Sequence, residues 1–137
     1  MAVPKIWRKI PEYYNLIGRQ CPECKELYFP VRDVCKKCGC LEMTDYKFEG
    51  KGQIVTFTIT RTPISDPEGE NTEIPARDVP YAVAVIKLEE GPMLTAEIVD
   101  CNFEDIEIGK NVEVVFRKIM EHGAKGVIQY GYKFRLC

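Results

Sequence analysis

Four of the seven cysteines in this 137-residue chain stand in two closely spaced pairs, and this spacing constrains the fold more than any other feature. The pairs form the pattern C-x2-C-x10-C-x2-C, which consists of Cys21, Cys24, Cys35 and Cys38. Tetrahedral zinc binds four thiolates at about 2.3 Å, and each C-x-x-C turn presents two of them from one tight loop. The spacing therefore predicts a zinc ribbon with these four cysteines as ligands.

The predicted zinc is structural, because four protein thiolates close the coordination sphere and leave no position for water or substrate. Iron bound as in rubredoxin uses the same ligand set and is the alternative, although its cysteine pairs normally lie farther apart in sequence. Disulfides are disfavoured, because the N-terminus has no apolar signal segment and a reducing cytosol keeps thiols free. We therefore expect a cytoplasmic protein with a structural Zn(II) ion.

Composition excludes several classes of protein. The chain is 45% apolar, which is ordinary for a globular domain, and it has no apolar run of the ~20 residues needed to span a bilayer. Nineteen Lys and Arg against 21 Asp and Glu give a formal charge of −2. Proteins that bind nucleic acid through phosphates usually carry a basic excess, so nucleic acid is not the expected partner.

The first 18 residues predict a helical arm. Trp7, Ile10, Tyr14 and Ile17 recur at spacings of three, four and three, which is one apolar stripe at helical period, and Gly18 is the expected stop. This stripe could pack on the protein's own ribbon or dock on a partner. Because an aromatic-rich arm lies outside the main core, docking on a partner is the favoured interpretation.

From Gly50 onward the apolar pattern changes to period two, which is typical of strands. Five strands are expected, and their inward or central residues are Val55, Phe57 and Ile59; Tyr81 to Leu88; Met93 to Val99; Val112, Val114 and Phe116; and Ile128, Tyr130, Tyr132 and Phe134. Five strands with little helix predict a small Greek-key barrel, of which the OB-fold is the commonest, with an SH3-like barrel as the rival. Two loops, 63–80 and 120–126, would flank the ligand face of such a barrel.

The expected architecture is therefore mainly β. It has three parts: a helical arm (1–18), a rubredoxin-like zinc ribbon (19–48) and a five-stranded OB-fold barrel (49–137). The sequence contains few signs of a catalytic site. It has no glycine-rich phosphate loop. Its only histidine, His122, lies in a glycine-flanked hairpin, and no cysteine stands at a spacing that indicates a cysteine–histidine nucleophile pair. We expect a protein that is not an enzyme.

The order of these parts resembles the family of zinc-ribbon OB-fold proteins found beside thiolases and related acyl-CoA condensing enzymes. The similarity extends over nearly the whole chain and rests on short motifs: Cys21-Pro22-Glu23-Cys24, Phe29-Pro30-Val31-Arg32, Cys35-Lys36-Lys37-Cys38-Gly39, Gly50-Lys51-Gly52, Pro80-Tyr81-Ala82-Val83-Ala84-Val85 and Ile108-Gly109. Val31 and Lys36 stand where the family often has proline. Neither departure touches a metal ligand.

The resemblance implies a non-catalytic subunit that holds acyl-CoA enzymes together and contributes to a coenzyme A site. The sequence is most similar to the archaeal members that bridge acetoacetyl-CoA thiolase and hydroxymethylglutaryl-CoA synthase in the mevalonate pathway, which implies these two enzymes as partners. The alternative is a nucleic-acid-binding zinc-ribbon and OB-fold module, in which Tyr130 and Tyr132 would stack bases. Their register with Ile128 and Phe134 indicates core positions instead.

Coenzyme A carries phosphates that need fixed cations, which Arg and Lys provide through charge-assisted hydrogen bonds. Arg61, Lys118 and Lys125 flank the two loops of the presumed ligand face, and Arg32 lies between the two cysteine pairs. These four residues are the candidate coenzyme A contacts. The alternative is that all four are solvated surface charges.

Overall fold

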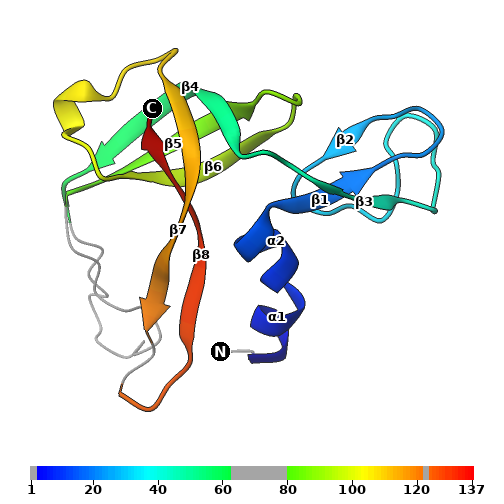
Figure 1. The fold of residues 1–137 in the computed structure, drawn as a ribbon, viewed down its shortest axis with the longest axis horizontal. Helices are drawn as coiled ribbons and strands as arrows, with labels where there is room; N and C mark the ends of the chain where they lie inside the picture. The colour runs from blue at the N-terminus through cyan, green and yellow to red at the C-terminus, as the bar shows by residue number, and fades with distance from the viewer. Residues whose placement is uncertain (1–2, 63–79, 122–123) are drawn as a thin grey trace.

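The computed structural model describes residues 3–62, 80–121 and 124–137, and its elements form an arm, a small sheet and a barrel (Figure 1). The arm consists of α1 (Val3–Arg8) and α2 (Ile10–Asn15), and the small sheet of β1 (Ile17–Gln20), β2 (Leu27–Tyr28) and β3 (Thr44–Lys47). The barrel consists of β4 (Lys51–Thr60), β5 (Tyr81–Leu88), β6 (Met93–Val99), β7 (Asn111–Glu121) and β8 (Ile128–Leu136), with the 3-10 turn η1 (Phe103–Asp105) before β7. The mainly β class with a zinc ribbon and an OB-fold is confirmed.

The arm is two short helices rather than one continuous stripe. The first helix ends at Arg8 and the second at Asn15, where Leu16 adopts a left-handed conformation with φ of 50°. Leu16 is only 2% exposed, so burial of its side chain accompanies the unusual backbone. The expected stop at Gly18 is therefore wrong, and Ile17 belongs to β1 instead of the helical stripe.

The small sheet is antiparallel, with strand order β2-β1-β3. Gly18 lies in its central strand, where an added Cβ atom would collide with the carbonyl of Tyr28 and the ring of Phe48. A glycine is required here because backbone and ring approach the strand closely. The sheet of the ribbon therefore packs against Phe48, the first residue after β3 in the connection to the barrel.

The barrel is closed in the order β4-β5-β6-β8-β7, with β6 and β8 parallel and the other neighbours antiparallel. Its interior is filled by side chains that are 1% exposed or less, namely Ile54, Ala82, Ala84, Ile86, Leu88, Val112 and Phe134. The strands at 81–88 and 93–99 have the predicted bounds. This barrel provides the main hydrophobic core.

The strand at the start of the barrel corrects one expectation. Val55 does not face inward: it is 41% exposed, whereas Ile54 is buried. A β-bulge between Ile54 and Thr56 shifts the register against β5, in which Ile54 is still opposite Ile86, and the backbone of Ile54 bonds to Gly109 and Lys110. A bulge adds one residue to one strand, so the residues that point into the barrel before the bulge and those that do so after it no longer follow one alternation.

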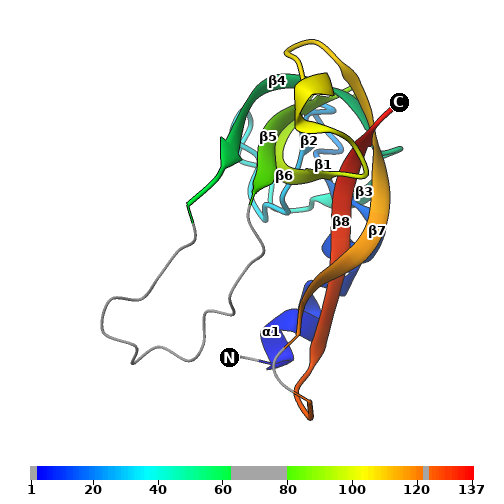
Figure 2. The ribbon, with the colours of Figure 1, turned by 90° about the vertical axis from the view of Figure 1, so that its left-hand side faces the viewer.

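The strands β7 and β8 form a long hairpin that continues beyond the barrel, as Figures 1 and 2 show. Phe134 lies inside the barrel, but Ile128 and Tyr130 are exposed, so their interpretation as core residues is wrong. The reason is that this end of β8 pairs only with β7 and has no opposite wall. We call residues 114–121 and 128–132 the hairpin extension.

The arm packs along this extension. The rings of Tyr13 and Tyr132 lie 6.1 Å apart, and those of Tyr14 and Phe116 lie 4.9 Å apart in an edge-on contact. Part of the predicted stripe therefore packs on the protein's own hairpin, while Trp7 on α1 stays 64% exposed.

Within the described residues, no helix has the length and apolar character that crossing a bilayer requires. His122 and nearly all of the expected loop 63–80 lie outside the described residues.

Candidate metal centre

Two knuckles of the same backbone form present the four cysteines. In the first, the N–H of Lys25 donates to the carbonyl of Cys21, and the N–H of Cys21 donates to the carbonyl of Glu26. The second repeats both bonds at the same spacing, from Gly39 to Cys35 and from Cys35 to Cys40. Lys25 and Gly39, at matching positions, both have positive φ, of 61° and 73°. The repeated turn is what directs each pair of sulfurs to one point.

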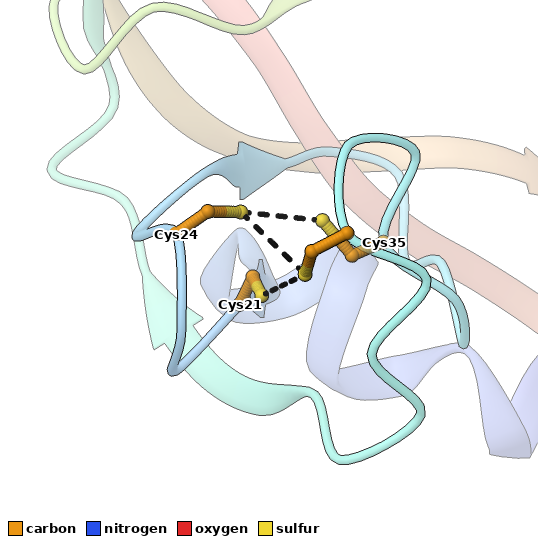
Figure 3. A group of neighbouring side chains, drawn as sticks. Cys21, Cys24 and Cys35 are labelled. Atoms are coloured by element: carbon orange, nitrogen blue, oxygen red, sulfur yellow. Dashed lines mark hydrogen bonds between the residues drawn. The ribbon is translucent and has the colours of Figure 1, made fainter.

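The four sulfurs cluster as one ion would require (Figure 3). The Sγ atoms are 3.4 Å apart for Cys21 and Cys38, 3.3 Å for Cys24 and Cys35, and 3.9 Å for Cys24 and Cys38, and all four lie within 4.8 Å of one another. A tetrahedron with zinc–sulfur bonds of about 2.3 Å has edges of about 3.8 Å. The four cysteines are thus arranged for binding a metal, and the donor set fits a structural zinc ion.

Tyr28 stabilises one of these sulfurs. Its hydroxyl accepts the N–H of Lys36 at 3.0 Å and lies 3.4 Å from the Sγ of Cys35, so its proton is directed to the sulfur. The Tyr28 hydroxyl and the backbone N–H of Cys38 lower the pKa of the Cys35 thiol to about 6. Outside the cluster, Lys37 and Glu26 form an ion pair at 2.8 Å that joins the two knuckles.

We expect Tyr28→Phe to make the ribbon release metal at a higher pH. Because the pKa of Cys35 is lowered, its thiolate is favoured at neutral pH, and this stabilisation is lost as the pH falls through about 6. Without the hydroxyl the pKa moves back toward 9, so protons compete with the metal at higher pH. A pH titration of zinc release to a chelator should shift upward by a few tenths of a pH unit.

The matched control is Tyr46→Phe. Tyr46 lies in β3 and its ring contacts Phe48 at 5.0 Å, away from the sulfurs. It should leave the release midpoint unchanged. Equal midpoints for Tyr28→Phe and the wild-type chain would show that the phenol contributes nothing to the metal centre.

The remaining cysteines lie outside the metal cluster. Cys40 is half-buried in the second knuckle, Cys101 is half-buried beside the barrel core, and Cys137 is exposed at the end of the chain. Among the described residues, the only group of at least three His, Cys, Asp or Glu side chains placed for a metal is the four-cysteine cluster.

The four candidate coenzyme A residues are all exposed, and the structure does not bring them to one place. Lys118 lies on β7 and Lys125 in the turn between β7 and β8, so these two share the hairpin. Arg61 directly follows the end of β4. Arg32 lies in the ribbon, where its guanidinium is 5.8 Å from the ring centre of Tyr28.

One surface was missed by the sequence analysis. Phe116 and Tyr130 are 49% and 36% exposed and stack on each other, with ring centres 5.5 Å apart. Their alternation with polar residues looks like that of a core strand. Strand length does not single out this hairpin, because β7 has 11 residues but β4, with ten, is longer than β8, with nine.

Comparisons with known proteins agree with this architecture. Residues 8–43 match the family described as "ChsH2, rubredoxin-like zinc ribbon domain", and residues 46–117 match "ChsH2, C-terminal OB-fold domain". A DUF35 domain-containing scaffold protein of Methanothermobacter thermautotrophicus is 44% identical over 135 residues, which cover 96% of this chain and 93% of that protein.

Two further proteins are similar to this chain. The probable enoyl-CoA hydratase alpha subunit of Thermomonospora curvata is 29% identical over 106 residues, which cover 77% of this chain and 30% of that protein. A solved structure named "Ltp2-ChsH2(DUF35) aldolase" superposes with a TM-score of 0.72 at 25% identity, covering 96% of this chain and 92% of that one.

Proposed function

Because the chain belongs to the family that joins a ChsH2-type zinc ribbon to a ChsH2-type OB-fold, we propose that it is a non-catalytic scaffold for acyl-CoA enzymes. The observation that carries this proposal is the match, along nearly the full length of both chains, to an archaeal protein named as a scaffold. The metal centre supports it, since four thiolates leave no open position for substrate chemistry. A related hydratase subunit and an aldolase complex support enzymes as the partners.

The partners that we propose are acetoacetyl-CoA thiolase and hydroxymethylglutaryl-CoA synthase, acting in the mevalonate pathway with a shared coenzyme A site. Thiolase condensation is unfavourable, so direct transfer of acetoacetyl-CoA to the synthase draws the reaction forward. A scaffold achieves this by raising the effective concentration of one enzyme at the other. This role requires binding surfaces and no catalytic group on the scaffold itself.

Reconstitution from purified proteins tests this function. The chain is mixed with the thiolase and the synthase of the same organism, and particle mass is measured by light scattering after size exclusion. We expect a particle containing all three proteins, and no stable thiolase–synthase particle when the chain is left out. If the two enzymes elute separately in the presence of the chain, the proposed partners are wrong. Binding of RNA instead, weakening steeply with salt, would favour the nucleic-acid alternative.

Coenzyme A binding gives a second test at the level of residues. In the assembled complex, Lys118→Ala or Lys125→Ala is expected to raise the apparent Kd of coenzyme A by about 5–30-fold, because each removes one charge-assisted contact to a phosphate. Calorimetric titration measures this effect, and Lys87→Ala, an exposed lysine on β5, is the control. Arg32→Ala and Arg61→Ala complete the set. Equal affinities for all four variants would place the phosphate contacts on the enzymes.

A further inference from the structure

Three exposed aromatic rings form one continuous surface on the arm and the hairpin extension. Tyr14 meets Phe116 edge-on at 4.9 Å, Phe116 stacks on Tyr130 at 5.5 Å with 12° between their planes, and all three rings are exposed. We call Tyr14, Phe116 and Tyr130 the aromatic face. Contiguous apolar surface on a soluble protein commonly marks a site of interaction, and aromatic residues dominate the energy of such sites.

Other packed side chains support the aromatic face. Tyr13, the neighbour of Tyr14, packs against Tyr132, and the half-buried Tyr132 in turn meets Phe29 at 5.7 Å and Phe134 at 6.3 Å. Glu12 of the same helix is buried and paired with Lys9 at 3.4 Å. The three rings are therefore presented on a preformed support, which lowers the entropy lost on binding.

Basic residues lie on the arm and on the hairpin that carry the aromatic face, although the whole chain has a net charge of −2. Lys118 lies directly opposite Tyr130 in the β7–β8 register, Lys5 and Arg8 lie in the last turn of α1, and Lys125 lies in the hairpin turn. Figures 1 and 2 both place α1 beside the hairpin extension. A second copy of the chain would oppose like charges across a two-fold interface, which disfavours self-association.

Three cations of β7 and β8 are paired with carboxylates, which argues against a path for nucleic-acid phosphates. Arg117 bonds to Asp100 at 2.6 Å, Lys133 to Glu97 at 2.9 Å, and Arg135 to Glu113 at 2.6 Å. Nucleic-acid affinity comes largely from cations that neutralise successive phosphates. An apolar surface with a narrow basic border fits a protein partner better than RNA.

We propose that the aromatic face is the docking surface for an acyl-CoA enzyme whose complementary surface is an apolar pocket bordered by carboxylates. This inference rests on the proposed scaffold function and specifies which face of the scaffold performs it. Trp7, the aromatic residue of α1, is 64% exposed and is a further candidate contact on the arm. The proximity of Lys118 places the proposed coenzyme A contact at the border of the same interface.

Alanine variants of the aromatic face test the proposal. The Kd of the full chain for the thiolase and for the synthase is measured separately by calorimetry, for the wild type, Tyr130→Ala, Phe116→Ala and Trp7→Ala. We expect the first two variants to raise the Kd for one of the enzymes by about 30-fold or more, as truncation of a central aromatic residue does. Ile108→Ala and Leu41→Ala are the controls, because both residues are apolar and even more exposed but lie elsewhere.

Thermal melts show that each variant is folded. Phe116→Ala could weaken the packing of the arm as well as remove a contact. Trp7→Ala avoids this ambiguity, because α1 contains no buried residue and its truncation should leave the packing of the arm intact. A wild-type chain that binds an enzyme, with unchanged affinity in all three aromatic variants, overturns this inference and leaves the scaffold function standing. A wild-type chain that binds neither enzyme overturns both. The inference is also overturned if Tyr130→Ala binds the enzymes normally but loses RNA binding or self-association. That result would assign the aromatic face to another partner.

Discussion

Cys35→Ser is expected to abolish zinc binding and to unfold the ribbon while the barrel stays folded. The ribbon's own buried cluster consists of Cys21, Cys35 and Met43, so two of its three members are proposed ligands. Its strands are only two to four residues long. A module this small cannot bury enough apolar surface to fold alone, and a structural zinc ion contributes on the order of 10 kcal/mol or more to such a fold.

Elemental analysis and limited proteolysis measure both parts of this result. The wild-type chain should contain one zinc per molecule, and the variant should contain none and be cleaved within residues 19–48. Cys101→Ser and Cys137→Ser are matched controls, because neither sulfur belongs to the cluster, and they should keep the full zinc content. Full zinc retention in Cys35→Ser would contradict the ligand assignment. A red wild-type protein containing iron would favour the rubredoxin-type alternative.

Features that depend on neighbouring residues could be predicted from the sequence. The zinc ribbon follows from four cysteines within eighteen residues, because each knuckle is one local turn with its own two hydrogen bonds. The strands at 81–88 and 93–99 follow from a continuous apolar segment and a tight turn at Gly91, whose φ is 121°. No distant residue is needed to specify these elements.

Features that depend on distant pairing could not be predicted. The exposure of Val55 is set by a bulge in the pairing of β4 with β5, next to a residue whose backbone bonds to the turn at Gly109 and Lys110, more than fifty residues away. The exposure of Tyr130 depends on where the barrel wall ends, and alternation along one strand does not contain that information. In the same way, Arg32, Arg61 and Lys118 are suitable cations individually, but only the fold shows that they lie in three separate regions.

Phe48→Ala is expected to destabilise the chain by about 3–5 kcal/mol, the usual range for removing a buried phenyl ring. Phe48 is 2% exposed and follows β3 directly. Its ring lies 5.9 Å from that of Phe29 and 5.0 Å from that of Tyr46, and its N–H donates to the carbonyl of Leu16 at 3.1 Å. Arm, ribbon and barrel connection therefore meet at this one side chain. A loss of this size is a large share of the ~5–15 kcal/mol that a typical domain has in total.

Urea unfolding followed by tryptophan fluorescence and circular dichroism measures the change, with the zinc content checked at each step. Trp7→Ala, followed by circular dichroism alone, is the matched control: it removes a larger aromatic ring that is mostly exposed, and it should change stability by no more than about 0.5 kcal/mol. Zinc should remain bound in Phe48→Ala, because the cysteine cluster is packed separately from the main core. Ribbon and barrel should then unfold in two transitions instead of one. A single transition with wild-type midpoint would mean that the two parts are coupled by contacts other than Phe48.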